Sequence, residues 1–213
     1  MQNDSDRGLD ATDRSVTTQE RDGHPTRAVR LSRLYDTTAE DLWAAITDPG
    51  RLARWFLPVS GDLRVGGRYQ LEGNAGGEIT RCDRPSRLAL TWEMGDQVSW
   101  VDVRLEPEGP ATRLLLEHTA PTADARWDEF GPGAVGVGWD LALPGLGRHL
   151  TGSGPGPQAD PAWVASDEGR EFVAATSAAW CRASIAAGTS RTAAEAAARR
   201  VTAFYTGDPS TPG

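Results

Sequence analysis

The stretch GGEITRCDRPSRLALTWE, residues 76–93, contains two short runs of strand-forming residues joined by the turn sequence DRPS. In the second run Leu88, Leu90 and Trp92 occupy alternate positions, so they point to one face of a strand. Two such runs with a short connection predict an antiparallel hairpin. An inward tryptophan can fill a core or line a binding cavity, and the sequence leaves both interpretations of Trp92 open.

Similar runs lie on either side of this stretch. Short segments rich in Gly, Pro, Asn and Asp separate six of them, GDLRVGG, RYQLEG, GEITRC, RLALTWE, QVSWVDVRLEP and TRLLLEHT. Their spacing predicts a six-stranded antiparallel meander with one apolar face that needs a cover. The run RAVRLSRLY, residues 27–35, predicts one further strand, so the sheet should have about seven.

Helical patterns frame the meander. Thr37 with Glu40 three residues later fits a capping box, and Asp48 followed by Pro49 can end that helix and begin a second. Residues 133–150, GAVGVGWDLALPGLGRHL, carry apolar side chains every three or four positions and predict the helix that covers the sheet. Pro144 is expected to kink it.

The remaining segments predict the domain organisation. Residues 1–26 are polar and lack apolar periodicity, which predicts a disordered tail, and residues 208–213 form a second tail. Residues 27–151 form one α+β domain. Residues 160–207 predict a helical extension packed on that domain, with Ser166 and Ser190 as N-caps.

Composition excludes several classes of function. The net charge of −8 disfavours nucleic acid and anionic membrane surfaces as partners. The sequence lacks a long apolar run and a secretory signal pattern, so we expect a cytoplasmic protein. It contains no lysine, which removes Schiff-base and P-loop chemistry. Cys82 and Cys181 lack metal-like spacing and are expected to be reduced thiols.

The order of these elements, with four local motifs, resembles a known superfamily. The motifs are TTAEDLWAAITDPGRLARWF, GDLRVGGRYQLEGNAGGEITRCDRPSRLALTWE, VDVRLEPEGPATRLLLEHT and GVGWDLALPGLGRHL. Over about residues 27–150 the chain resembles the SRPBCC, or START-like, superfamily, and within it the group named for a domain of the activator of heat-shock protein 90 ATPase (AHSA-type). The all-arginine basic composition, rich in Ala, Gly and Pro, is typical of a GC-rich bacterial genome such as an actinobacterial one.

The resemblance implies a helix-grip fold, in which a curved antiparallel sheet wraps a long C-terminal helix and leaves a cavity between them. Extra C-terminal helices would lie outside this unit. Residues expected to point into the cavity are Trp55, Phe56, Tyr69, Leu90, Trp92, His118, Trp139 and Leu143. For each aromatic side chain taken alone, core filling is favoured over ligand contact, and only the family resemblance makes the set point to a cavity.

Catalytic candidates are few. His118, Glu78 and Tyr69 could act as cavity acids or bases, although a structural role for His118 is favoured because spacing pairs it with no second group. The run GPGAVG, residues 131–136, matches GxGxxG but lacks the preceding strand that a dinucleotide site requires. Asp124, Asp128 and Glu129 are interpreted as an acidic loop, and no metal or other cofactor is expected.

Three functions follow. The first is binding of a small apolar or aromatic ligand between sheet and helix, without catalytic machinery. The second is a cyclase- or hydrolase-like enzyme that uses the three candidates above. The third is a protein-interaction module with a chaperone or other protein partner, and a homodimer is a further possibility.

Overall fold

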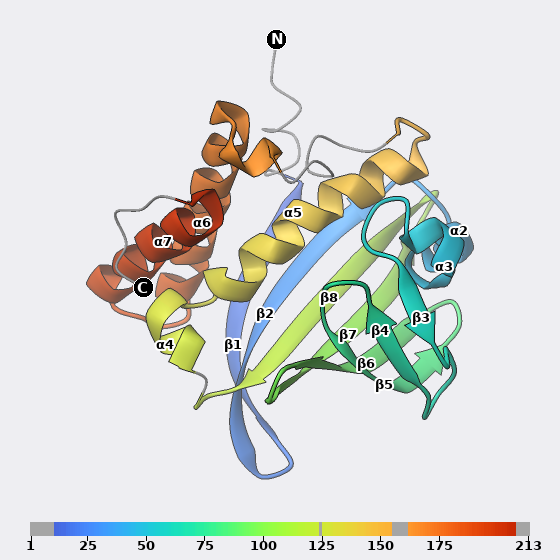
Figure 1. Cartoon of the computed structure of the whole chain (residues 1–213), viewed down its shortest axis with the longest axis horizontal. Helices are drawn as coiled ribbons and strands as arrows, with labels where there is room; N and C mark the ends of the chain where they lie inside the picture. Colours follow the sequence, from blue (N-terminus) through green and yellow to red (C-terminus); the bar gives the residue numbers. More distant parts are fainter. Residues whose placement is uncertain (1–10, 124, 155–161, 208–213) are drawn as a thin grey trace.

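The computed structural model describes residues 11–123, 125–154 and 162–207. One antiparallel sheet curves around helix α5, and the remaining helices lie at its two sides (Figure 1). The strands are β1 (Thr12–Arg21), β2 (His24–Tyr35), β3 (Val59–Gly61), β4 (Arg68–Leu71), β5 (Gly76–Asp83), β6 (Arg87–Met94), β7 (Gln97–Glu108) and β8 (Ala111–Pro121). The helices are α2 (Ala39–Thr47), α3 (Pro49–Leu52), α4 (Ala125–Phe130), α5 (Gly133–Leu150), α6 (Asp167–Ala186) and α7 (Arg191–Thr206), with a 3-10 turn at Trp163–Ala165.

The strand order is β1-β2-β8-β7-β6-β5-β4-β3. The predicted meander is therefore confirmed from β4 to β8, its first strand lies earlier in the sequence than predicted, and the β1–β2 hairpin extends the sheet beyond β8. In the register, Leu31 of β2 pairs with Leu116 of β8, which pairs with Val103 of β7. Because paired residues share a face, these side chains form one apolar row on the concave side.

The N-terminal hairpin corrects the prediction of a disordered tail over residues 1–26. Residues 12–21 form β1 and pair with β2 from Arg21↔His24 to Thr12↔Arg33, whereas residues 1–10 lie outside the described residues. Asp22 and Gly23, with φ of 53° and 78°, form the two-residue turn. Asp-Gly is a strong hairpin signal. Apolar periodicity does not reveal β1, because Val16 is its only aliphatic side chain. The strand is held mainly by its backbone pairing with β2.

Three further predictions need correction. Strand β3 covers residues 59–61 and not the GDLRVGG run, where Gly66, with a φ of 79°, lies in the turn that precedes β4. The N-cap of α2 is Thr38, whose hydroxyl accepts from the Asp41 N–H, so the cap lies one residue later than predicted. Residues 125–130, interpreted as an acidic loop, form α4.

Other helix signals are confirmed by their hydrogen bonds. Asp48 caps α3, Ser166 caps α6 and Ser190 caps α7, in each case by accepting from a backbone N–H three residues later. Helix α5 lies along the concave face of the sheet and continues through Pro144. Gly136 allows α6 to approach it, because a Cβ there would lie 2.2 Å from the Trp180 ring.

A buried ion pair joins β1, α5 and α6. Arg14 donates to Asp140 at 2.8 Å, and the exposed side-chain fractions are 8% and 2%. The Trp180 indole N–H also donates to Asp140, at 2.8 Å. Burial raises the pKa of the Asp140 carboxyl, while the Arg14 and Trp180 hydrogen bonds oppose that shift. The N-terminal strand and the first helix of the C-terminal extension therefore meet at one carboxylate on α5.

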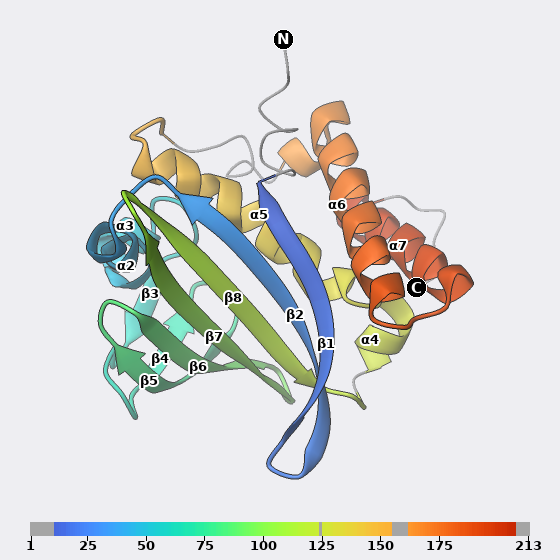
Figure 2. The same ribbon diagram turned by 180° about the vertical axis from the view of Figure 1, so that it is seen from behind.

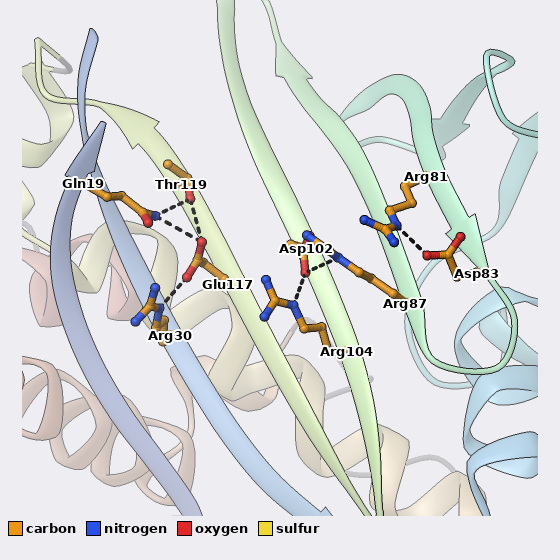
Figure 3. Close-up of polar contacts among 9 residues, drawn as sticks. All are labelled: Gln19, Arg30, Arg81, Asp83, Arg87, Asp102, Arg104, Glu117 and Thr119. Atoms are coloured by element: carbon orange, nitrogen blue, oxygen red, sulfur yellow. Dashed lines mark hydrogen bonds and ion pairs between the residues drawn. The ribbon is translucent and has the colours of Figure 1, made fainter. Parts of the chain in front are cut away.

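The opposite face of the sheet is polar. Figure 3 shows the ion pairs on this face: Arg30 with Glu117 links β2 and β8, and Arg87 with Asp102 links β6 and β7. Arg104 also pairs with Asp102, within β7. Figure 2 views the molecule from behind, where the strands carry no covering helix. The helices thus cover only the concave face of the sheet, which is the face that packs against α5.

Removing the buried cation tests its structural role. We expect Arg14→Met to lower the free energy of unfolding by about 3–5 kcal/mol, because Asp140 would be left charged and buried without its partner. Arg104→Met is the matched control, since that arginine is 53% exposed, and should cost less than about 1 kcal/mol. Denaturant unfolding measures both. Equal losses of unfolding free energy in Arg14→Met and Arg104→Met would contradict the structural role. The double variant Arg14→Met/Asp140→Asn should recover much of the stability that Arg14→Met loses.

Candidate functional site

Strand β6 has an inward face that is not fully packed. Leu88, Leu90 and Trp92 point to the concave side yet remain half-buried. On the adjacent strands, Val101 is 3% exposed and Leu116 is 4% exposed. An inward apolar face stays accessible only where no other side chain covers it. The concave side is therefore more open over β6 than over most of β7 and β8, and the half-buried Val103 of β7 adjoins the open part.

This hollow, the inner cavity, has a volume of about 170 Å³. It is bounded by the α2–α3 segment, by β3 to β8 and by α5. Seven of the eight predicted cavity residues line it, namely Trp55, Phe56, Tyr69, Leu90, Trp92, Trp139 and Leu143. The rest of its wall is aliphatic except for Thr47 and Cys82. Such a wall suits an apolar ligand.

Four aromatic rings form a continuous row along the cavity. Ring centroids are 5.5 Å apart for Trp55 and Phe56, 6.0 Å for Phe56 and Trp139, and 5.3 Å for Trp139 and Trp92. The Trp55 indole N–H donates to the Ala45 carbonyl at 2.9 Å, which fixes the end of the row on α2. Ring contacts at these distances stabilise one another and hold the wall in shape.

His118 is the predicted residue that does not line the inner cavity. It lies behind Trp92 and Trp139, and its ring centroid is 5.8 Å from the Trp92 ring. The Trp139 indole N–H lies 3.2 Å from its Nδ1 and must donate to it, so Nδ1 is an acceptor. Its Nε2 lies 2.8 Å from the Ser99 hydroxyl, which donates to the Trp92 carbonyl at 3.0 Å. Both ring nitrogens are therefore occupied.

This network keeps His118 neutral. Burial lowers the pKa of His118 from 6.5 to about 4. Protonation would also place a hydrogen on Nδ1, against the Trp139 N–H. Sequence reasoning missed Ser99, although the register Trp92↔Ser99 across the β6–β7 hairpin places the two residues opposite each other. The arrangement is that of a structural histidine that positions two tryptophans.

The other two catalytic candidates do not offer a free acid or base to the cavity. Tyr69 lines the cavity, but its hydroxyl donates to the Thr91 carbonyl at 2.7 Å and burial raises its pKa. Glu78 is exposed and lies next to the inward Ile79, so its side chain is on the outer face of β5. The structure therefore does not bring His118, Glu78 and Tyr69 together.

One of the acidic candidates that follow β8 takes part in an ion pair. Asp128 pairs with Arg27 at 3.4 Å, and Asp124 lies outside the described residues. Within the described ranges, no cluster of His, Cys, Asp and Glu could hold a metal ion. Cys82 and Cys181 are free thiols, with Cys82 at the wall of the inner cavity. None of the helices in the described part of the chain is long and apolar enough to cross a membrane.

Comparison with known proteins agrees with this geometry. Residues 36–151 match the profile of the family described as Activator of Hsp90 ATPase homolog 1-like protein, which is more than half of the chain. The chain belongs to this family. No curated protein sequence matches it significantly. The helix-grip fold is the one that this family membership implies.

Solved structures extend the likeness beyond the family match. The crystal structure of CalU16 from Micromonospora echinospora is 33% identical with a TM-score of 0.67, and the alignment covers 81% of this chain and 98% of CalU16. The solution structure of CalU16 gives 34% identity, a TM-score of 0.68 and coverages of 84% and 97%. An HSP90 activator from Plasmodium falciparum shares the fold at 24% identity and a TM-score of 0.51, with coverages of 59% and 96%.

DynU16, described as a protein in the dynemicin biosynthetic locus, also shares the fold. Its identity to this chain is 22% and the TM-score is 0.53, with coverages of 60% of this chain and 48% of DynU16.

The depressed pKa of His118 predicts a pH dependence of stability. As the pH falls from 6.5 to about 4, unfolded chains take up a proton on this residue and the folded protein does not, so the folded state loses stability over that window. The loss should reach about 3 kcal/mol. The variant His118→Gln lacks this pH-dependent contribution to the unfolding free energy. The difference in unfolding free energy between wild type and variant should therefore shrink from pH 7 to pH 4 and stay constant above pH 7. A difference that does not change with pH would contradict a neutral, buried His118.

Proposed function

We propose that the protein binds a small apolar or aromatic ligand in the inner cavity and does so without catalysis. The observation that carries the proposal is the half-buried inward face of β6, whose Trp92 is the last ring of the aromatic row. Apolar side chains that remain accessible inside a fold gain contacts when a ligand fills the space. Release of that surface from water is the driving force for binding.

The size of the cavity limits the ligand. An apolar protein cavity of about 150 Å³ can take up benzene. The inner cavity, at about 170 Å³, has room for a single ring or an aliphatic group of similar size. Most of its polar groups are already engaged, because the Tyr69 hydroxyl, the Trp55 indole N–H and the Thr47 hydroxyl donate to backbone carbonyls. Shape and apolar contact should therefore decide affinity.

Filling the cavity should abolish binding without unfolding the protein. Leu90→Phe places a larger side chain in the void, so benzene binding measured by calorimetry should weaken at least about tenfold. The melting temperature should stay the same or rise, since cavity filling commonly stabilises a fold. Leu34→Phe is the matched control, because Leu34 is 44% exposed and does not line the cavity. Unchanged benzene affinity in Leu90→Phe would refute the proposal.

The natural ligand can be sought directly. Native mass spectrometry of the protein purified from its source should show a mass above that of the chain. The added mass should be lost when the protein is unfolded, because the bound ligand is then released. The same measurement on Leu90→Phe should lack the added mass. A chain mass without addition in both proteins would leave the benzene experiment as the test of the cavity.

The enzyme and protein-interaction hypotheses have weaker support. The candidate acids and bases are either hydrogen-bonded or on the outer face. The likeness to the Plasmodium falciparum HSP90 activator is one of fold. A chaperone partner and a homodimer stay predictions.

A further inference from the structure

A second hollow lies on the other side of Trp92. Its volume is about 360 Å³, and it is bounded by the β6–β7 hairpin, the end of β8, α4, the first turn of α5 and the last turns of α7. We call it the outer chamber. Among the described residues, Trp92 alone lines both the outer chamber and the inner cavity. Helix α7 lies outside the region that matches the family, so this wall belongs to the C-terminal extension.

The wall of the outer chamber is aromatic and held in place. The Phe204 ring is 5.6 Å from the Phe130 ring and 5.3 Å from the Tyr205 ring. The Tyr205 hydroxyl donates to the Ala134 carbonyl at 3.1 Å, which ties α7 to the first turn of α5. Rings fixed in this way can stack on a flat ligand without a large loss of side-chain entropy.

Exposed apolar side chains gather at the same place. Phe204 is 67% exposed, and Met94 and Val98 are each 44% exposed. They are three of the six large apolar side chains that are exposed in the described residues, and all three line the chamber. Large apolar side chains grouped at a concave surface indicate a binding site.

The polar side chains of the wall do not favour a charged ligand. His118 and Ser99 bond to each other and to Trp139 and Trp92. Asp96 and Arg126 carry opposite charges, and the Gln97 amide is uncharged. Stacking and apolar contact should therefore supply most of the recognition.

We propose that the outer chamber is a binding site for a flat, uncharged aromatic compound of two or three fused rings. Its volume lies within the range of about 300–1,000 Å³ that is usual for ligand sites, whereas that of the inner cavity does not. The site is built from α4, α7 and the β6–β7 hairpin, so it does not depend on occupation of the inner cavity. The C-terminal extension thereby gives this chain a ligand site that the family match does not contain.

Acridine, a flat three-ring compound, tests the proposal by calorimetry at pH 8. Wild-type protein should bind it. Val98→Trp fills the chamber and should weaken binding at least about tenfold, whereas Val65→Trp, at an exposed valine that lines neither hollow, should not change it. Phe204→Ala removes a stacking ring and should weaken binding about three- to tenfold. Because Phe204 is mostly exposed, this variant should fold as the wild type does.

The inner-cavity variant separates the two proposals. Leu90→Phe should leave acridine affinity unchanged while it removes benzene binding. The outer-chamber proposal is overturned if wild-type protein does not bind acridine, if Val98→Trp and Phe204→Ala bind it as wild type does, or if Leu90→Phe alone loses it. In the last case acridine would occupy the inner cavity, which would leave the first proposal standing.

Discussion

The position of helix α5 decides where this protein can bind anything, and one buried carboxylate fixes that position. Asp140 accepts hydrogen bonds from Arg14 on β1 and Trp180 on α6. The preceding residue, Trp139, faces the inner cavity and donates to His118. A rotation of α5 that broke the hydrogen bonds of Asp140 would therefore also displace Trp139 from the cavity wall and from His118. The N-terminal hairpin and the C-terminal extension thus help to shape a cavity that neither of them lines.

A hydrogen-bonded network holds the partition between the two hollows. Trp92 stands between them, and His118 holds Trp139 and, through Ser99, the Trp92 backbone. A buried polar network in which every member is bonded is rigid and selects one arrangement. The partition consequently acts as a fixed apolar wall, which favours ligands recognised by shape and stacking over substrates that need proton transfer.

Much of the fold and of the inner cavity could be predicted from local patterns. The meander, the cover helix and seven cavity residues follow from alternation, helical spacing and family resemblance. Strand β1 could not be found by periodicity, because its inward positions carry Thr12, Arg14 and Thr18 beside a single valine. Its Asp22-Gly23 turn was the available signal. The outer chamber was not predictable, since its wall joins α4 and α7, which are separated by about seventy residues in sequence and approach only through packing.

By itself the sequence determined the periodic elements, because alternation and helical spacing are properties of neighbouring residues. It also determined the absence of lysine chemistry and the aromatic character of the concave face. Only the tertiary structure decided which inward side chains are packed and which remain accessible, whether His118 finds two partners, and on which side of Trp92 each hollow lies. Those properties depend on distances between segments far apart in the chain, and such distances are set by the packing of the whole molecule.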